Sequence, residues 1–170
     1  MKKKIIIAVF LMLSLTVSFI LGSCADPDVK TAVTLTVKAG DFVFVNHETV
    51  TVSTASDNTN GPSVLDVIKT YIDGHPDTNI QINDTSLLRF GMYYETTYKD
   101  VTYYWSYTVN GNEPTSGKAN SNYVKAGDEI VYSLVAMTTN TAGDSVVSDY
   151  DTDSRIFEDE LYESSTTEQE

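Results

Sequence analysis

Side chains that commonly carry catalysis are sparse in this sequence. His47 and His75 are its only histidines, and neither has a second histidine, a cysteine or a glutamate at the spacing of a metal site. The sequence contains no Gly-x-Ser-x-Gly motif, no cysteine–histidine pair, no phosphate-binding glycine loop and no His-Glu-x-x-His motif. We therefore expect both histidines to lie in surface loops, and we expect that the protein is not an enzyme.

Carboxylates near the C-terminus form a weak candidate for a calcium site. Positions 1, 3, 5 and 12 of an EF-hand loop, whose carboxylate oxygens surround the ion, are matched by Asp149, Asp151, Asp153 and Glu160. Ser154 replaces the glycine that the sharp turn of such a loop needs, and Arg155 adds a positive charge. The alternative is a solvated acidic tail over residues 138–170, in which a short helical patch against the domain or a partner could still be formed by Ile156, Phe157, Leu161 and Tyr162.

Aromatic side chains gather between residues 93 and 107. They are Tyr93, Tyr94, Tyr98, Tyr103, Tyr104, Trp105 and Tyr107. Tyrosine and tryptophan offer large, stiff, amphipathic contact area and are favoured at recognition sites. The candidate ligand-binding residues are therefore Tyr93, Tyr94, Tyr104, Trp105 and Asn110. The alternative is plain packing, because half of the residues of any strand face a core and Trp105 is expected to fill it.

A strand and two turns must position these aromatic residues. Residues 103–109 alternate between two sets of side chains, a period of two that places one set on each face of a strand. Asn110-Gly111 tolerates positive φ and predicts a tight turn at the end of that strand. Ala126-Gly127-Asp128 is a second turn signal, and residues 129–134 alternate as the next strand.

The preceding part of the chain predicts a hairpin and one helix. Residues 31–38 and 42–54 are rich in β-branched residues, and Ala39-Gly40-Asp41 between them is a turn signal. Ser63 is an N-cap followed by a helix with an apolar stripe, and Asp73-Gly74 ends it. A helix this short is unstable alone, so its stripe must lie on the sheet. A short strand is expected at residues 79–82.

Several of these motifs together resemble the transcobalamin C-terminal-like family over roughly residues 31–135. The similar stretches are the strand end Trp105-x-Tyr107-x-Val109-Asn110-Gly111, Gly117, the turn and strand start at residues 126–130, and the helix start at residues 63–68. The resemblance implies an α+β fold, a small β-grasp-like domain with a mixed sheet and one packed helix. It also implies cobalamin as a specific ligand, because the corresponding domain of cobalamin carriers closes over the corrinoid.

The N-terminus predicts export and a lipid anchor. Three lysines precede an apolar segment from Ile5 to Ile20, which is the pattern of a secretory signal. Leu21-Gly22-Ser23-Cys24 then resembles the lipobox of bacterial lipoproteins, which implies that Cys24 is lipidated and anchors the protein to the cell membrane. The predicted organisation is a signal peptide over residues 1–23, a tether over 24–30, a domain over 31–137 and a disordered acidic tail over 138–170.

The charge of the chain restricts its partners. The formal net charge is −13, and it becomes −16 when Lys2, Lys3 and Lys4 are removed with the signal peptide. Such an acidic protein is not expected to bind nucleic acid, because phosphate recognition depends on basic side chains. We therefore expect an extracytoplasmic, non-catalytic binding domain for cobalamin or a similar small ligand. The alternative is a structural or adhesion module that docks a surface protein through its aromatic edge.

Overall fold

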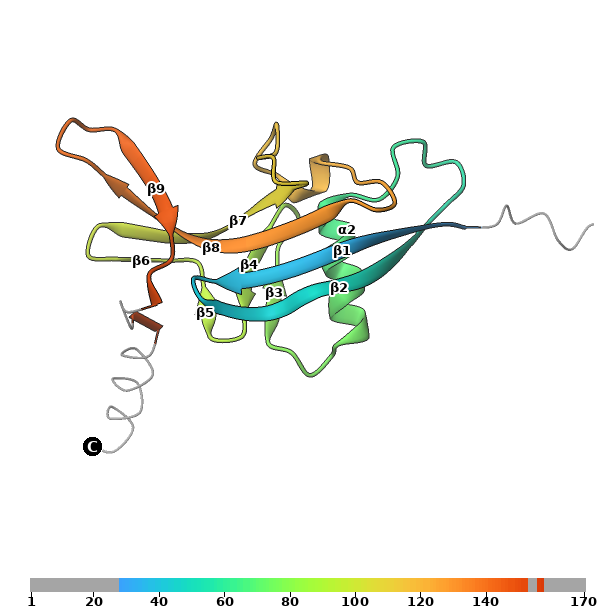
Figure 1. Ribbon diagram of the computed structural model, residues 1–170, viewed down its shortest axis with the longest axis horizontal. Coiled ribbons are helices and arrows are strands. Elements are labelled where there is room, and N and C mark those ends of the chain that lie inside the picture. The colour runs from blue at the N-terminus through green and yellow to red at the C-terminus, as the bar shows by residue number, and fades with distance from the viewer. Residues whose placement is uncertain (1–27, 153–155, 158–170) are drawn as a thin grey trace, which may run out of the picture.

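The computed structural model describes residues 28–152 and 156–157, so Cys24, Asp153 and Glu160 lie outside the described residues. The described chain forms a large curled sheet, a small sheet and one α-helix (Figure 1). The strands of the large sheet are β1 (Val29–Ala39), β2 (Phe42–Thr54), β6 (Thr96–Tyr98), β7 (Val101–Val109), β8 (Glu129–Thr139) and β9 (Ser145–Asp149).

Strand β8 organises the large sheet, whose order is β2-β1-β8-β7-β6 with β9 attached to β8. The first half of β8 pairs with β1 in parallel, up to the pair Ala39 and Leu134. From Val135 onward the same edge of β8 pairs with β9 in antiparallel orientation. One edge of β8 is therefore shared by two strands of opposite direction, which makes the sheet mixed.

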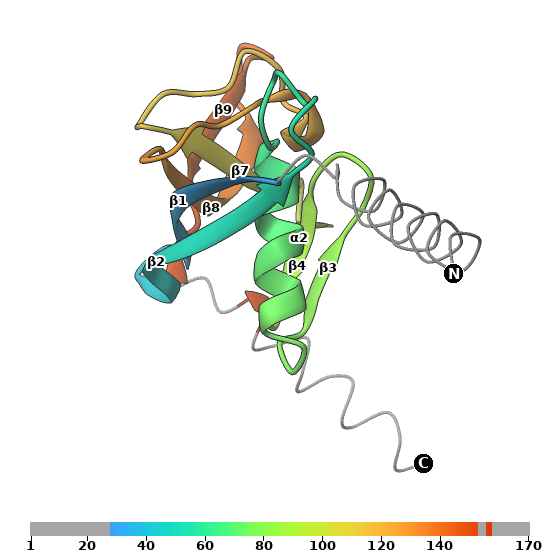
Figure 2. The ribbon, with the colours of Figure 1, turned by 90° about the vertical axis from the view of Figure 1, so that its right-hand side faces the viewer.

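The helix α2 (Val64–Gly74) and a small sheet cover one face of the large sheet, as Figure 2 shows. The small sheet contains β3 (Ile80–Ile82), β4 (Leu87–Phe90) and β5 (Tyr93–Tyr94), and a short 3₁₀ helix, η1, spans Ala119–Ser121. Helix α2 begins with a capping box, in which the Ser63 side chain accepts from the Asp66 N–H and Asp66 accepts from the Ser63 N–H. Its buried stripe confirms the helix that the sequence predicts.

The core lies between the covered face of the large sheet and these layers. Alternate residues of each central strand point into it, among them Leu35 in β1, Trp105 in β7 and Leu134 in β8. The opposite face of β7 carries Tyr104, Ser106 and Thr108, which are half-buried. The period of two that the sequence shows in residues 103–109 is therefore confirmed, with the aromatic set inward and the hydroxyl-rich set outward.

The predicted α+β class is wrong, because the domain is mostly β. Strands account for 50% of the structure and helices for 13%, and the large sheet curls into a half-barrel. The additional strands come from two segments that have no clear alternation in the sequence, residues 87–98 and residues 145–149. Strands this short depend on the neighbouring strand and not on their own pattern, so periodicity does not reveal them.

The predicted disordered tail is also wrong for its described residues. Strand β8 continues to Thr139, β9 returns along it, and Tyr150, Ile156 and Phe157 are buried in the core. The average composition of residues 138–170 did not predict this order, because a few aromatic side chains can bury enough surface to order a segment that is polar on average.

Candidate functional site

The residues selected from the sequence do not form one site. Tyr93 and Trp105 are buried in the core, and only 4% of the Trp105 surface is exposed. Tyr94 is half-buried, and the Arg89 guanidinium carbon lies 4.5 Å from its ring centroid. Tyr104 lies on the opposite face of the sheet, and Asn110 lies in the turn after β7.

Tyr93 and Tyr94 belong to a closed aromatic cluster that we call the aromatic seam, which consists of Tyr93, Tyr94, Tyr103, Tyr150 and Phe157. Phe157 is its centre, with ring centroids 5.2 Å from Tyr93, 5.3 Å from Tyr94, 5.6 Å from Tyr150 and 6.0 Å from Tyr103. These separations are typical of favourable aromatic pairs. Only 2% of Phe157 is exposed, so the centre of the seam is packed interior, with half-buried Tyr94 at its margin.

Asn110 is a structural residue in this fold. Its backbone has φ 52°, the left-handed region that asparagine tolerates. Its side chain donates to Asp128 Oδ1 at 2.8 Å and accepts from the Glu129 N–H at 2.9 Å. Both ends of the amide are therefore used to join the turn after β7 to the turn before β8.

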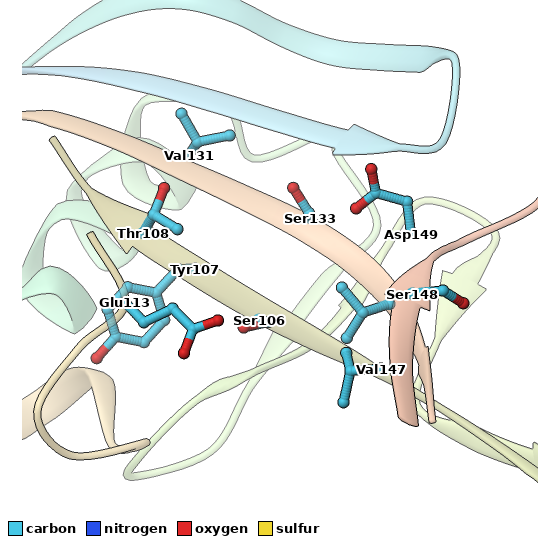
Figure 3. Close-up of a pocket in the computed structure, with 10 residues that line it drawn as sticks. Ser106, Tyr107, Thr108, Glu113, Val131, Ser133, Val147, Ser148 and Asp149 are labelled. Atoms are coloured by element: carbon cyan, nitrogen blue, oxygen red, sulfur yellow. The ribbon is translucent and has the colours of Figure 1, made fainter. Parts of the chain in front are cut away.

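A hollow of about 220 Å³ lies on the outer face of the large sheet (Figure 3). We call it the outer hollow. Hydroxyl groups line it from three strands and are those of Ser106, Thr108, Ser133 and Ser148. Valine side chains complete its surface and are those of Val131, Val135 and Val147. Tyr104 is the neighbour of this hollow because it pairs with Val135 across the sheet.

Two carboxylates flank the outer hollow. Glu113 comes from the loop after β7 and Asp149 from the end of β9, and Figure 3 shows them on opposite sides of the hollow. Within the described residues, neither side chain forms an ion pair or a hydrogen bond. The hollow is therefore negative and has unused hydrogen-bond acceptors.

Exposed apolar side chains gather where β2 begins, in a surface that we call the aromatic tip: Phe42, Val43 and Phe44. Their exposed fractions are 49%, 52% and 37%. The Phe44 ring still contacts Tyr93 and Phe90, with centroids 5.2 and 5.4 Å apart, so the tip borders the aromatic seam. Strand β2 is the last strand of the described sheet on this side, so its outer backbone edge has no partner strand there.

The turn before the aromatic tip packs against the residues that directly follow β9. Gly40 has φ 55°, and a Cβ added there would lie 2.5 Å from the backbone oxygen of Tyr150. Glycine is therefore required by both the backbone conformation and the space. The tip is exposed, but its base is fixed against the core.

The histidines and C-terminal carboxylates are placed as follows. His47 forms a bulge in β2 and not a loop, and its Nε2 lies 3.1 Å from Glu129 Oε1. His75 follows α2, where its ring stacks on Tyr71 at 4.1 Å and its Nε2 lies 3.5 Å from Glu48 Oε1. No group of three or more metal-binding side chains is found in residues 28–152 and 156–157, and half of the predicted calcium loop lies outside them.

Buried tyrosines in the core have perturbed hydroxyl groups. Burial raises the pKa of Tyr132 far above its ordinary value, and the neighbouring Tyr107 adds to the shift. Burial also raises the pKa of Tyr107, although a hydrogen bond that Asn122 Nδ2 donates to its hydroxyl at 2.7 Å opposes the shift. The Tyr132 hydroxyl has no hydrogen-bond partner among the described residues. These groups shape stability at high pH, and Tyr107 is also one of the residues that line the outer hollow.

Sequence reasoning missed both open surfaces. The outer hollow is formed by serine and threonine at alternate positions of β7 and β8, and hydroxyl residues on a solvent-facing strand surface are too common to attract notice. The aromatic tip did carry a signal, because Phe42 and Phe44 directly follow a turn in a strand. That signal is clear only once β2 is known to be an edge strand.

Comparisons with known proteins are sparse. No protein-family model matches the chain, and no curated protein matches it. One similar solved structure is that of a "putative metal binding protein" from Ruminococcus gnavus ATCC 29149, with 15% sequence identity and a TM-score of 0.35. The similarity covers 61% of this chain and 95% of that one, and it is too distant to transfer a fold or a function.

The resemblance to the transcobalamin C-terminal-like family therefore stays a prediction.

Among the described residues, no helix combines the length and apolar character that crossing a membrane demands.

Proposed function

We propose that this protein is an exported, lipid-anchored surface protein whose domain binds a protein partner, without catalysis, through the aromatic tip. The observation that carries the proposal is the exposure of Phe42, Val43 and Phe44 together on an edge strand. Three successive exposed apolar side chains on an edge strand are uncommon on soluble domains and mark interaction surfaces. Aromatic groups in particular dominate the binding energy of protein interfaces.

The position of the tip relative to the predicted anchor supports this proposal. Cys24 precedes Val29, the first residue of β1, by only a few residues. Strand β1 has 11 residues, so its far end lies roughly 33 Å from its start at the usual rise per residue. The aromatic tip follows the turn at that far end (Figure 1). A domain anchored at Cys24 would thus present the tip away from its anchored end.

The edge of β2 also restricts how a partner can bind. The bulge at His47 interrupts the ladder between the pairs Leu35 with Glu48 and Val37 with Val45. Bulges bend a strand and disrupt continuous pairing along its edge. A second register shift lies within the segment from Phe42 to Val45, so a partner at the tip would depend on apolar side chains that pack on the two phenylalanines more than on a continuous backbone ladder. This arrangement fits a short extended segment of a surface protein.

Cobalamin, which the family resemblance implies, is the second candidate. Tyr93 and Trp105 are buried, so a corrinoid would have to contact the outer face near Tyr104, where the outer hollow lies. Saturable binding of cobalamin, measured by equilibrium dialysis and weakened by Tyr104→Ala, would support this ligand. If the protein retains no more cobalamin in dialysis than a non-binding control protein does, cobalamin is excluded as the ligand.

Site-specific photo-crosslinking on intact cells that naturally carry the protein tests the main proposal. A photoreactive phenylalanine replaces Phe44 in one variant and Thr51 in the control, because Thr51 is also exposed on β2 but lies toward the opposite end of the strand. We expect one defined adduct from position 44 and none from position 51. Identical adducts from both positions, or none from position 44, would contradict docking at the tip.

A further inference from the structure

We propose that the outer hollow binds a small organic cation, an amine or a guanidinium of the size of one lysine or arginine side chain. This site is separate from the aromatic tip and does not depend on the function proposed for the tip. The proposal combines the shape of the hollow, its unused acceptors and its charge.

The shape of the hollow comes from the return of β9. Beyond Leu134, β9 takes the place of β1 along β8, and it brings Val147 and Ser148 beside the outer face. The loop after β7 brings Glu113 to the other side. Four separate segments of the chain therefore converge on one concavity of about 220 Å³. Its size fits a fragment smaller than most drug-sized ligands, whose pockets are about 300–1,000 Å³.

The polar groups of the hollow favour a donor-rich ligand. The hydroxyls of Ser106, Thr108, Ser133 and Ser148 make no side-chain hydrogen bond within the described residues. Serine and threonine hydroxyls can accept from a bound N–H, and carboxylates accept only. Ser106 and Ser133 are directly paired across β7 and β8, so their hydroxyls form one patch. A ligand with several N–H groups uses this patch better than one with acceptors alone.

The charges of the hollow select for a cation. Glu113 and Asp149 flank it, and neither is neutralised by a described residue. Lys38 lies in β1 beside Ser133, but no ion pair joins it to either carboxylate within the described residues. The formal net charge of −13 adds a general attraction for cations. An anionic ligand would meet repulsion here.

The valines explain why the cation should have an apolar stem. Val131, Val135 and Val147 lie among the hydroxyls in the same hollow. Lysine and arginine side chains place their methylene groups along apolar surface while the charged head reaches polar groups. A guanidinium has five donors in a planar fork and pairs with carboxylates in two parallel hydrogen bonds. Glu113 or Asp149 would hold the head while the valines contact the stem.

Amide NMR of the isotopically labelled full chain, purified in a non-ionic detergent, tests this site. The probes are Nα-acetyl-arginine amide, free arginine and Nα-acetyl-citrulline amide, a neutral isostere of the first. We expect saturable shifts at Ser106, Ser133 and Ser148 with arginine amide, and about tenfold weaker binding of the citrulline probe, as expected for the loss of one charge-assisted interaction. Equal binding of both probes, or no saturable shift, would overturn the proposal.

Carboxylate variants provide the matched control. Glu113→Gln and Asp149→Asn should each weaken binding of arginine amide several-fold, and the double variant should abolish it. Asp57→Asn removes the same charge from an exposed loop outside the hollow and should leave binding unchanged. An equal loss in the Asp57 variant would show that only net charge matters and would reject the site. Crosslinking at position 44 should be unaffected by the hollow variants, so the two proposals can fail separately.

The two sources of such a cation can be distinguished with the same probes. Binding of arginine amide but not of free arginine, whose carboxylate the acidic hollow repels, would indicate the side chain of a peptide. Comparable binding of both would indicate a free metabolite.

Discussion

The aromatic seam and the aromatic tip are neighbouring aromatic regions with opposite exposure. Phe157 of the seam is 2% exposed and contacts four other rings, whereas Phe42 of the tip is 49% exposed. Phe42 and Tyr93 join the two regions, with ring centroids 6.3 Å apart. The difference shows that the density of aromatic residues along the chain marks the core of this domain, whereas the exposed aromatic side chains, on which the proposed docking depends, are a few residues at an edge strand.

The largest expected effect is on the seam. Phe157→Ala should lower the free energy of unfolding by about 3 kcal/mol, because it removes a buried ring and leaves a cavity among the tyrosines. Chemical denaturation, monitored by circular dichroism, measures the free energy of unfolding of both proteins. A loss below about 1 kcal/mol, the level typical of partly exposed positions, would mean that the segment after β9 is not part of the core.

Asn110→Ala should have the next largest effect. It removes the two side-chain hydrogen bonds that join the turns around β7 and β8, and it places alanine at positive φ. We expect a loss of about 1–2 kcal/mol in the free energy of unfolding. Asn110→Gly relieves the backbone but not the hydrogen bonds, so it should recover part of that loss. A wild-type stability for Asn110→Ala would return this residue to the candidates for ligand binding.

Tyr132→Phe should leave stability near neutral pH unchanged or raise it by up to about 1 kcal/mol, because it removes a buried hydroxyl without a partner. Its effect should grow above pH 10, the ordinary pKa of tyrosine. The folded state keeps the Tyr132 proton there while the unfolded state loses it, so the native protein loses stability as pH rises further. Thermal unfolding from pH 8 to 11 should show that the melting temperature falls less steeply with pH for Tyr132→Phe than for the wild-type protein. An equally steep fall in both proteins would contradict this expectation.

The smallest effect should be at the tip. Val43→Ser should change the free energy of unfolding by no more than about 0.5 kcal/mol, because the side chain is 52% exposed. The same denaturation experiment measures it beside Phe157→Ala. A large loss at Val43 would mean that the tip is packed interior, and the contrast between the two aromatic regions would disappear.

Much of the framework could be predicted from local signals. Ser63 caps the expected helix, the turn at Gly40 joins the expected hairpin, and β7 alternates as expected. These features depend on residues close in sequence. Strand β9 could not be predicted, because Val146 and Val147 acquire their role only by pairing with Thr138 and Met137. The packing of the seam could not be predicted either, because its covering residue, Phe157, comes from a segment that is polar on average.

The outer hollow could not be predicted for a similar reason. Ser106 and Ser133 become neighbours through the pairing of β7 with β8, and Asp149 reaches them only through β9. No local pattern in the sequence brings these three residues together. Sites of this kind depend on the sheet topology, which composition and periodicity do not determine.

Hydroxyl-radical footprinting, on intact cells and on the purified protein, tests the central claim in both regions at once. If the tip docks a partner while the seam is core, Phe42 and Phe44 are oxidised in the purified protein and protected on cells. Tyr150 and Phe157 stay unreactive in both, because they are buried. Equal oxidation of Phe42 and Phe44 in both settings would contradict docking at the tip. Oxidation of Phe157 in the purified protein would contradict the assignment of the seam to the core.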